Sequence, residues 1–115
     1  MNYKGSCHCG QIAFQVEGDL AQVIECNCSH CSRKGYLLWF VPHEKLRLTT
    51  PESNLATYMF NKHVIHHHFC PDCGIEAFAR GQKPDGTAVV AINVRCLDKI
   101  DIAALKPQHF DGRSK

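Results

Sequence analysis

The sequence predicts a mainly β fold, and three observations support that prediction. Short segments alternate apolar and polar residues, turn-forming residues separate these segments, and only one segment has helical spacing. Ile12, Phe14 and Val16 alternate with other residues in the period-two pattern of a strand that buries one face. Residues 98–106 have the spacing of a short C-terminal helical segment, which Pro107 would end.

The other predicted elements follow from the same patterns. The run YLLWFV at residues 36–41 is continuously apolar, so it is either a fully buried strand or part of a pocket wall. Asn61-Lys62-His63 separates two strand-like segments and predicts the tip of a hairpin, while residues 83–86 predict a turn. Further strands are expected at residues 46–49, 57–60, 64–66, 75–80 and 88–97.

Length and composition limit the class of protein. At 115 residues, the chain predicts one domain that spans residues 1–115. Hydrophobic residues make up 44% and charged residues 21%, which excludes a disordered polar tail. No apolar stretch is long enough to span a bilayer, and no signal-peptide core follows Met1. We therefore expect a cytoplasmic protein without a membrane partner.

The chain is unusually rich in metal-ligand residue types, with eight cysteines and eight histidines. Clustered thiols in a reducing compartment predict metal ligands, whereas four disulfides would be expected of a small secreted chain. Seven of the cysteines form three tight clusters, which are Cys7 with Cys9, Cys26 with Cys28 and Cys31, and Cys70 with Cys73.

Metal binding would also change the charge of the protein. The formal net charge of +2 treats every thiol as neutral, but metal-bound cysteines are thiolates. A site of one zinc ion and four thiolates carries a net charge of about −2, and a site with three thiolates carries about −1. Added to the formal charge of +2, the two sites bring the loaded chain to about −1. A nucleic-acid partner is therefore not expected, because the protein would lack an overall basic field.

Cys70-Pro71-Asp72-Cys73-Gly74 has the spacing of a zinc knuckle, in which a tight turn brings two sulfurs to one metal. Cys7-His8-Cys9-Gly10 is the most economical source of the other two sulfurs, since residues two apart project to the same side of an extended segment. We expect Cys7, Cys9, Cys70 and Cys73 to form a closed structural zinc site. The alternative, a redox Cys-x-x-Cys pair, belongs at a strand-to-helix junction.

Cys26, Cys28 and Cys31 lie within one loop and could close on a second zinc ion. Three protein ligands with one exchangeable position are typical of catalytic zinc, which can bind an incoming thiol or polarise a carbonyl. In the alternative interpretation, His30 or Cys96 supplies a fourth ligand. Cys96 lies on the apolar face of its predicted strand, where a small core residue is expected.

The run His66-His67-His68 could suggest a further metal site. In a strand, His66 and His68 face one way and His67 faces the other, so the three cannot all meet one ion. We therefore expect a half-exposed polar strand here rather than a third site.

These motifs resemble the glutathione-dependent formaldehyde-activating (GFA) family, over nearly the whole chain. The resemblance rests on residues 5–10 (GSCHCG), 26–31 (CNCSHC), 69–74 (FCPDCG), 93–98 (NVRCLD) and 109–112 (HFDG). Residues 34–36 (KGY), 40–42 (FVP) and 58–61 (YMFN) are similar to the branch that includes vertebrate centromere protein V.

The resemblance implies a β-tent fold of small antiparallel sheets around zinc. It also implies a structural zinc at Cys7, Cys9, Cys70 and Cys73, and a catalytic zinc at Cys26, Cys28 and Cys31. The implied activity is a carbon–sulfur lyase reaction, the condensation of formaldehyde with glutathione to S-hydroxymethylglutathione. The expected partners are thus a small-molecule thiol such as glutathione and an aldehyde, with two zinc ions per chain as cofactors.

Two other function classes stay open at this point. One is a zinc-stabilised binding module without catalysis, and the other is a reductase that uses Cys96 as a redox thiol, although Cys96 is expected to be buried. Several residues have two interpretations each. Arg33, Lys34 and Lys62 either bind the carboxylates of glutathione or lie in solvent, and Trp39 and Phe40 either line a pocket or pack in the core.

Overall fold

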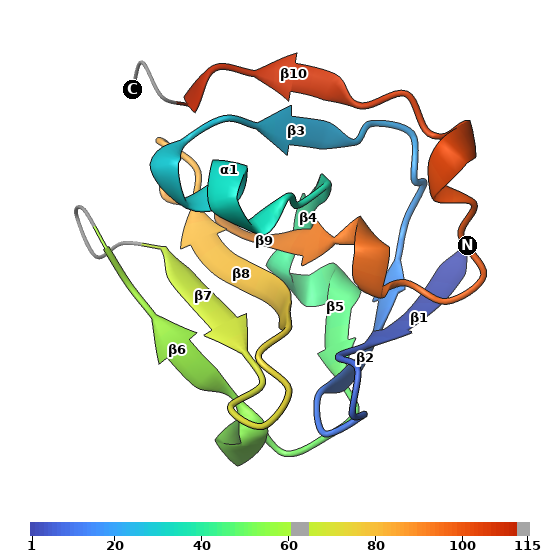
Figure 1. Cartoon of the computed structure of the whole chain (residues 1–115), viewed down its shortest axis with the longest axis vertical. Coiled ribbons are helices and arrows are strands. Elements are labelled where there is room, and N and C mark those ends of the chain that lie inside the picture. The colour runs from blue at the N-terminus through green and yellow to red at the C-terminus, as the bar shows by residue number, and fades with distance from the viewer. Residues whose placement is uncertain (61–64, 113–115) are drawn as a thin grey trace.

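The structure is a computed structural model that describes residues 1–60 and 65–112 (Figure 1). Its elements are short strands linked by turns, with one short α-helix. The strands are β1 (Asn2–Ser6), β2 (Ala13–Glu17), β3 (Ile24–Cys26), β4 (Leu38–Pro42), β5 (Leu46–Leu48), β6 (Ala56–Tyr58), β7 (His66–Phe69), β8 (Glu76–Gln82), β9 (Ala88–Asn93) and β10 (Gln108–Phe110). The helix α1 spans Ser29–Lys34, and 3-10 turns lie at His43–Lys45, Glu52–Asn54, Val94–Cys96 and Ile102–Ala104.

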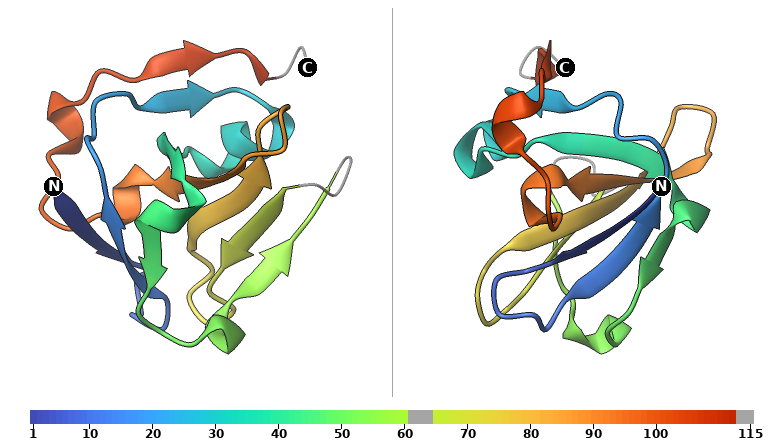
Figure 2. Two further views of the ribbon diagram at one scale, coloured as in Figure 1. Left: turned by 180° about the vertical axis from the view of Figure 1, so that it is seen from behind. Right: turned by 90° about the vertical axis from the view of Figure 1, so that its right-hand side faces the viewer.

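The strands form two sheets, which confirms the predicted mainly β fold. A three-stranded sheet has the order β1-β2-β5, and a seven-stranded sheet has the order β10-β3-β4-β9-β8-β7-β6. All pairings are antiparallel except that of β10 with β3, which is parallel. Both views in Figure 2 show β10 running beside β3, so the C-terminal segment forms one edge of the larger sheet.

The hydrophobic core unites residues from both sheets. Phe14 of β2 and Phe78 of β8 are fully buried, and their rings meet edge to face with centroids 5.9 Å apart. Ile12, Phe14 and Val16 are all buried while Gln15 between them is only partly so, which confirms the period-two prediction for this strand.

The helical content lies elsewhere than the sequence indicated. Residues 98–106 contain only the 3-10 turn Ile102–Ala104, where the Asp101 side chain accepts a hydrogen bond from the N–H of Ala103. The α-helix lies instead in the cysteine-rich segment expected to be a loop. Its N-cap is Cys28, whose sulfur accepts a hydrogen bond from the N–H of Cys31, so a thiol takes the place of the usual Ser or Asp.

Two other predictions change at strand ends. The strand expected at 88–97 ends at Asn93, because the Asn93 side chain accepts a hydrogen bond from the N–H of Arg95 and caps the 3-10 turn Val94–Cys96. The predicted hairpin is formed by β6 and β7, but its tip, Asn61-Lys62-His63, lies outside the described residues. In the described part of the chain, the helices are all too short to cross a bilayer.

Candidate metal centre

The first cysteine group joins two loops that are far apart in sequence. Cys7 and Cys9 follow β1, and Cys70 and Cys73 follow β7. Their four sulfurs lie within 4.8 Å of one another. The sulfur of Cys9 is 3.7 Å from that of Cys7 and 3.5 Å from that of Cys70. Tetrahedral zinc with Zn–S bonds of about 2.3 Å requires S–S separations of about 3.8 Å, so this donor set fits the metal.

The backbone of both loops supports the sulfurs. The N–H of Ile12 donates to the sulfur of Cys7 at 3.4 Å, and the N–H of Cys73 donates to the sulfur of Cys70 at 3.5 Å. Gly74 has a φ of +79°, a conformation that other residues adopt only with strain. Amide hydrogens directed at sulfur are typical of cysteine loops that bind metal, so the backbone geometry of both loops suits a metal site.

The second cysteine group lies around the N-terminus of α1. Cys26 ends β3, Cys28 caps the helix and Cys31 lies in its first turn. Their three sulfurs also lie within 4.8 Å of one another. The sulfur of Cys26 accepts a hydrogen bond from the N–H of Cys28 at 3.4 Å, and that of Cys28 accepts one from the N–H of Cys31 at 3.3 Å.

The thiols of this group differ in their readiness to ionise. Burial opposes ionisation of Cys28, but hydrogen bonds from the backbone N–H groups of Cys31 and His30 lower the pKa of its thiol below the ordinary value. Burial, together with the neighbouring sulfurs of Cys28 and Cys26, raises the pKa of Cys31. Three thiolates repel one another at this distance, so a cation among them is what allows all three to ionise.

Neither candidate for a fourth ligand joins the three thiols. Within residues 1–60 and 65–112, no fourth Cys, His, Asp or Glu donor belongs to this group. The His30 ring turns toward His67, with ring centroids 4.1 Å apart. Cys96 is buried and receives a weak hydrogen bond from the side chain of Asn93 at 3.5 Å, which confirms its assignment to the core. Burial raises the pKa of the Cys96 thiol to about 12, so it is a poor redox nucleophile.

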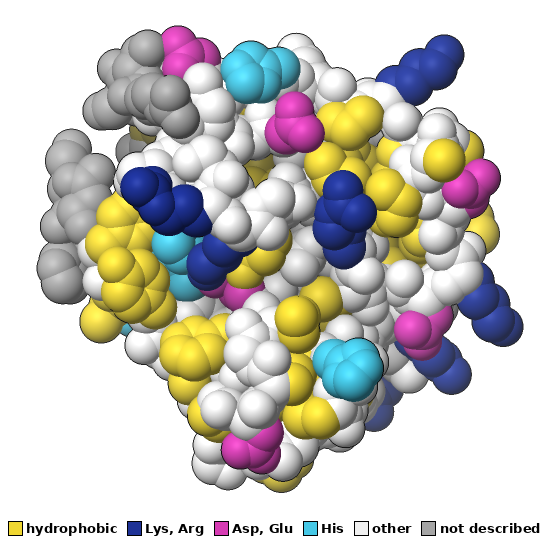
Figure 3. Space-filling model, in the orientation of Figure 1, with side chains coloured by type: hydrophobic (Ala, Val, Ile, Leu, Met, Phe, Trp, Pro, Cys, Tyr) yellow, Lys and Arg dark blue, Asp and Glu magenta, His cyan; other side chains and the backbone are white. Residues whose placement is uncertain are grey.

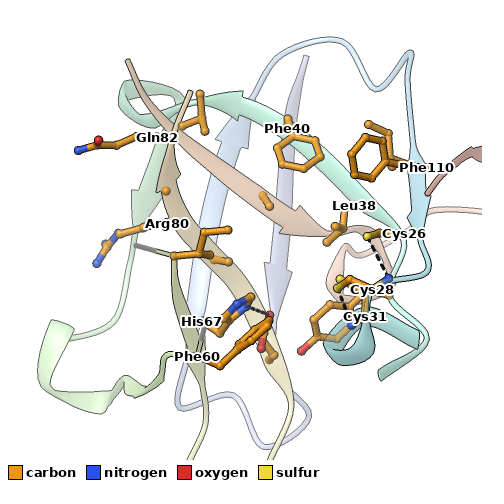
Figure 4. A pocket seen from close by; sticks show the side chains of 18 residues that line it. Cys26, Cys28, Cys31, Leu38, Phe40, Phe60, His67, Arg80, Gln82 and Phe110 are labelled. Atoms are coloured by element: carbon orange, nitrogen blue, oxygen red, sulfur yellow. Dashed lines mark hydrogen bonds and ion pairs between the residues drawn. The ribbon is translucent and has the colours of Figure 1, made fainter. Parts of the chain in front are cut away.

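The three thiols form part of the wall of a cavity of about 310 Å³ (Figure 4). Most of the wall is apolar, and its polar groups include His67, Glu76 and Arg80. Phe40 and Phe110 are 49% and 46% exposed, respectively, at the cavity. The other lining residues include Ile24, Tyr36, Leu38, Phe60, Ala79 and Ala91. An apolar cavity beside a thiol cluster can hold a small ligand away from water.

The C-terminal segment covers one side of the three thiols. Phe110 pairs with Cys26 across the parallel β10–β3 ladder, and its carbonyl accepts a hydrogen bond from the N–H of Asn27 at 3.2 Å. The side chain of Asn27 donates to that of Asp111 at 2.9 Å. Gly112 follows so closely that a Cβ placed there would lie 2.6 Å from the sulfur of Cys26.

Comparison with known proteins identifies the family to which this chain belongs. The profile of one protein family, described as glutathione-dependent formaldehyde-activating enzyme (GFA), matches residues 2–111. The chain belongs to the GFA family. A protein of Colletotrichum graminicola, named as a candidate glutathione-dependent formaldehyde-activating enzyme, is 29% identical over 92 residues, which are 72% of this chain and 48% of that protein. The GFA chain thus spans about half the length of this curated relative.

A solved structure has the same fold as this GFA chain. The crystal structure of a Rhodobacter sphaeroides protein matches it with a TM-score of 0.81 and 30% sequence identity. The match covers 92% of this chain and 97% of the other.

Two of the basic residues that could bind the carboxylates of glutathione, Arg33 and Lys34, have partners within the GFA chain itself. Lys34 forms an ion pair with Glu76, and the Arg33 guanidinium donates to the carbonyl of Ser29 at 2.8 Å. Lys62 lies outside the described residues. Figure 3 shows basic, acidic, histidine and hydrophobic side chains interspersed on one face, rather than one extended basic surface.

The aromatic and histidine predictions had mixed outcomes. Trp39 is buried in the core, where its ring meets that of Tyr3 edge to face, but half-exposed Phe40 lines the cavity. The expectation of a half-exposed histidine strand is wrong for His67 and His68, because both side chains are buried on opposite faces of β7. His67 faces the cavity, whereas His68 contacts Thr57 and Phe78.

Sequence reasoning did not single out Glu76 of the site, and it named Tyr36 only as part of the run at residues 36–41 and of the KGY segment. Glu76 is the first residue of β8, and its carboxylate lies against His67 and Lys34. The Lys34 ammonium lies over the Tyr36 ring, with its nitrogen 5.0 Å from the ring centroid. Burial raises the pKa of the Tyr36 phenol. The sequence signal that could have indicated this site is a Glu within the otherwise apolar segment 75–79, because a carboxylate in such a strand is rarely buried without a partner.

Proposed function

We propose that this chain is a zinc-dependent, carbon–sulfur lyase-type enzyme that joins a low-molecular-weight thiol, such as glutathione, to formaldehyde. One observation carries the proposal: Cys26, Cys28 and Cys31 converge on the wall of a cavity, and no fourth protein donor joins them in the described residues. Such three-ligand sites leave one position for a substrate. Membership of the GFA family supports the same class of reaction.

The chain's own residues supply binding and orientation. When bound, zinc would lower the pKa of a thiol that reaches its free position. Leu38, Phe40 and Phe110 add apolar surface to the cavity that the thiols line, which favours partial desolvation of a bound substrate. The phenol of Tyr36 stays protonated because burial raises its pKa, so it can donate a hydrogen bond to the aldehyde oxygen. Holding the thiol and aldehyde together supplies much of the rate gain in an addition of this kind.

The second part of the proposal concerns the other cysteine group. Cys7, Cys9, Cys70 and Cys73 would hold a structural zinc, which brings the content to two zinc ions per chain. This closed site ties the loop after β1 to the loop after β7, so residues 1–115 would fold as one unit. Free thiols of this number suit the reducing cytoplasm, and the segments KGY, FVP and YMFN favour the centromere protein V-like branch of the family.

The experiment uses cobalt in place of zinc, because cobalt reports its ligands in the visible spectrum. Glutathione is titrated onto the cobalt-loaded protein, and its S-methyl derivative serves as the matched control without a free thiol. We expect glutathione alone to change the d–d and sulfur-to-metal bands. Exchange NMR on the zinc-loaded protein then measures formation of the thiol–formaldehyde adduct against the uncatalysed rate.

The outcomes separate an enzyme from a binding module. A spectral change with glutathione, together with faster adduct formation, supports the proposal. A spectrum that glutathione leaves unchanged, with adduct formation at the uncatalysed rate, would contradict it and favour a zinc-stabilised module without catalysis.

A further inference from the structure

His67 and Glu76 form a buried pair on the wall of the cavity. His67 lies on β7 and Glu76 begins β8, and Nδ1 of the imidazole is 3.3 Å from a carboxylate oxygen of Glu76. Their side chains are only 9% and 3% exposed. A bulge between His68 and Phe69 shifts the β7–β8 register and places Phe69 opposite Glu76. The pair is therefore produced by an irregularity in the sheet.

The hydrogen bond to Glu76 indicates which ring nitrogen of His67 carries the proton. A carboxylate accepts hydrogen bonds, so Nδ1 of His67 carries the hydrogen and Nε2 is left as an acceptor. Nε2 is buried and has no hydrogen-bond partner in the described structure. Such an unpaired buried group is destabilising and calls for a functional reason. The His67 side chain lines the cavity, and a hydrogen from a substrate bound there would complete the bond.

Neighbouring groups fix the His67 ring in this orientation. Phe60 stacks on it with ring centroids 5.4 Å apart, and the His30 ring lies 4.1 Å away on α1. The Lys34 ammonium pairs with the other carboxylate oxygen of Glu76, so that carboxylate is held from two sides. Figure 4 shows His67 and Phe60 together, on the side of the cavity that faces Cys28 and Cys31.

We propose that His67 is the proton-transfer residue of the thiol–aldehyde reaction and that Glu76 positions it, an inference that rests on the proposed function. Nε2 takes the proton as the S–H bond breaks. The sulfur electron pair forms the C–S bond, and the carbonyl π pair moves to the aldehyde oxygen. The imidazolium beside Glu76 then gives the proton to that oxygen, so the product is the hydroxymethyl thioether and His67 is neutral again.

A metal ligand role for the same residues fits the structure less well. His30, His67 and Glu76 have donor atoms within 4.8 Å of one another, a separation that a cation could bridge. However, the Lys34 ammonium already contacts the Glu76 carboxylate and would repel a second cation. The geometry thus favours a charge-balanced proton-transfer group over a third metal ion.

The first test reads the tautomer in the zinc-loaded wild-type protein by ¹⁵N NMR of the histidine side chains. Resonances are assigned with His67→Gln and, as the matched control, His66→Gln, which replaces the exposed neighbour outside the cavity. We expect His67 to be protonated on Nδ1 with a bare Nε2, and Glu76→Gln to shift the proton toward Nε2. A proton fixed on Nε2 in the wild type would overturn the proposal without any measurement of activity.

The second test measures the catalysed rate of adduct formation by exchange NMR, with zinc content and circular dichroism as checks of folding. We expect His67→Gln to lower kcat about 100-fold and Glu76→Gln about 10-fold, both with an unchanged KM for glutathione, while His66→Gln retains the wild-type rate. A folded His67→Gln variant with the wild-type rate would overturn the role of His67 alone. A wild-type protein without any rate enhancement would overturn the proposed function and this role together.

Metal analysis of the same samples closes the remaining alternative. Two zinc ions per chain in both the wild type and His67→Gln support a role in proton transfer. A third equivalent in the wild type that His67→Gln loses would overturn the proposal, because Nε2 would then be a ligand.

Discussion

The sulfur of Cys9 lies 3.5 Å from the sulfur of Cys70, although 61 residues separate them in the chain. This contact joins the loop after β1 to the loop after β7. Strand β1 belongs to the smaller sheet and β7 to the larger one. The two sheets share one core, so the cysteine contact and the core fix the same relative placement. Loss of a metal here would release both loops at once.

Cys73→Ser is expected to prevent stable folding. Structural zinc contributes free energy on the order of 10 kcal/mol to folding, which exceeds the stability of most small domains. Circular dichroism and zinc content of the purified variant measure the effect. Cys96→Ala is the matched control, since it removes a buried thiol outside both groups and should keep both zinc ions. A Cys73→Ser variant as stable as the wild type would contradict the structural assignment.

Cys28→Ser is expected to give a folded protein with one zinc ion and without turnover. Cys28 contributes to the cavity site and to the cap of α1, but it does not join the group formed by Cys7 and its partners. Serine is itself a preferred N-cap residue, so the cap of α1 is kept, and we expect the melting temperature to fall only by what the lost zinc ion contributes to stability. Calorimetry and metal analysis check this result. Equal destabilisation by Cys28→Ser and Cys73→Ser would refute the division into structural and catalytic sites.

Gly112→Ala is expected to weaken metal binding at the three thiols while the four-thiol group keeps its metal. The added Cβ would lie 2.6 Å from the sulfur of Cys26, so either the C-terminal segment or the thiol must move. Overpacking of this kind costs about 1–3 kcal/mol, which corresponds to a loss of affinity of about 5-fold to 160-fold. Competition with a chromophoric chelator measures it. Gly81→Ala is the control, because its Cβ would meet Ile65 at an ordinary 3.5 Å.

The stability of the protein is expected to fall between about pH 6.5 and pH 4, in part because of His68. Burial lowers the pKa of His68 to about 4, from 6.5 in the unfolded chain. In this interval the unfolded state binds a proton that the folded state does not, so the free energy of unfolding rises with pH.

Urea denaturation at several pH values, with zinc in excess, measures this dependence. His68→Gln should reduce the slope of the free energy of unfolding against pH by up to one proton. Identical slopes in His68→Gln and the wild type would disprove the assignment.

Local spacing was enough to predict the cysteine groups and several strands. Cys70 and Cys73 lie in one turn, and residues 12–16 repeat with period two, so neither prediction depends on distant parts of the chain. The assembly of four thiols required one further step, the pairing of two half-sites that have the same trailing glycine.

Features that depend on long-range pairing or on unusual caps could not be predicted in this way. β10 has only three residues and exists because it pairs with β3, more than 80 residues earlier. The helix α1 begins at a cysteine, which is not a typical N-cap residue. The approach of His67 to Glu76 depends on a bulge, and sequence periodicity contains no signal for it. For Phe40, an apolar run could not distinguish a buried face from a cavity wall.

The wall of the cavity comes from three parts of the chain that are distant in sequence. Its lining residues include Ile24 and Phe40, then Phe60 and Ala91, and finally Phe110. No fragment that lacks one of these parts can offer the complete binding surface. A small molecule bound there therefore associates with the native state alone, and by mass action it stabilises every element of the fold. Ligand-induced thermal protection would thus report the integrity of the whole molecule, even for compounds that do not react.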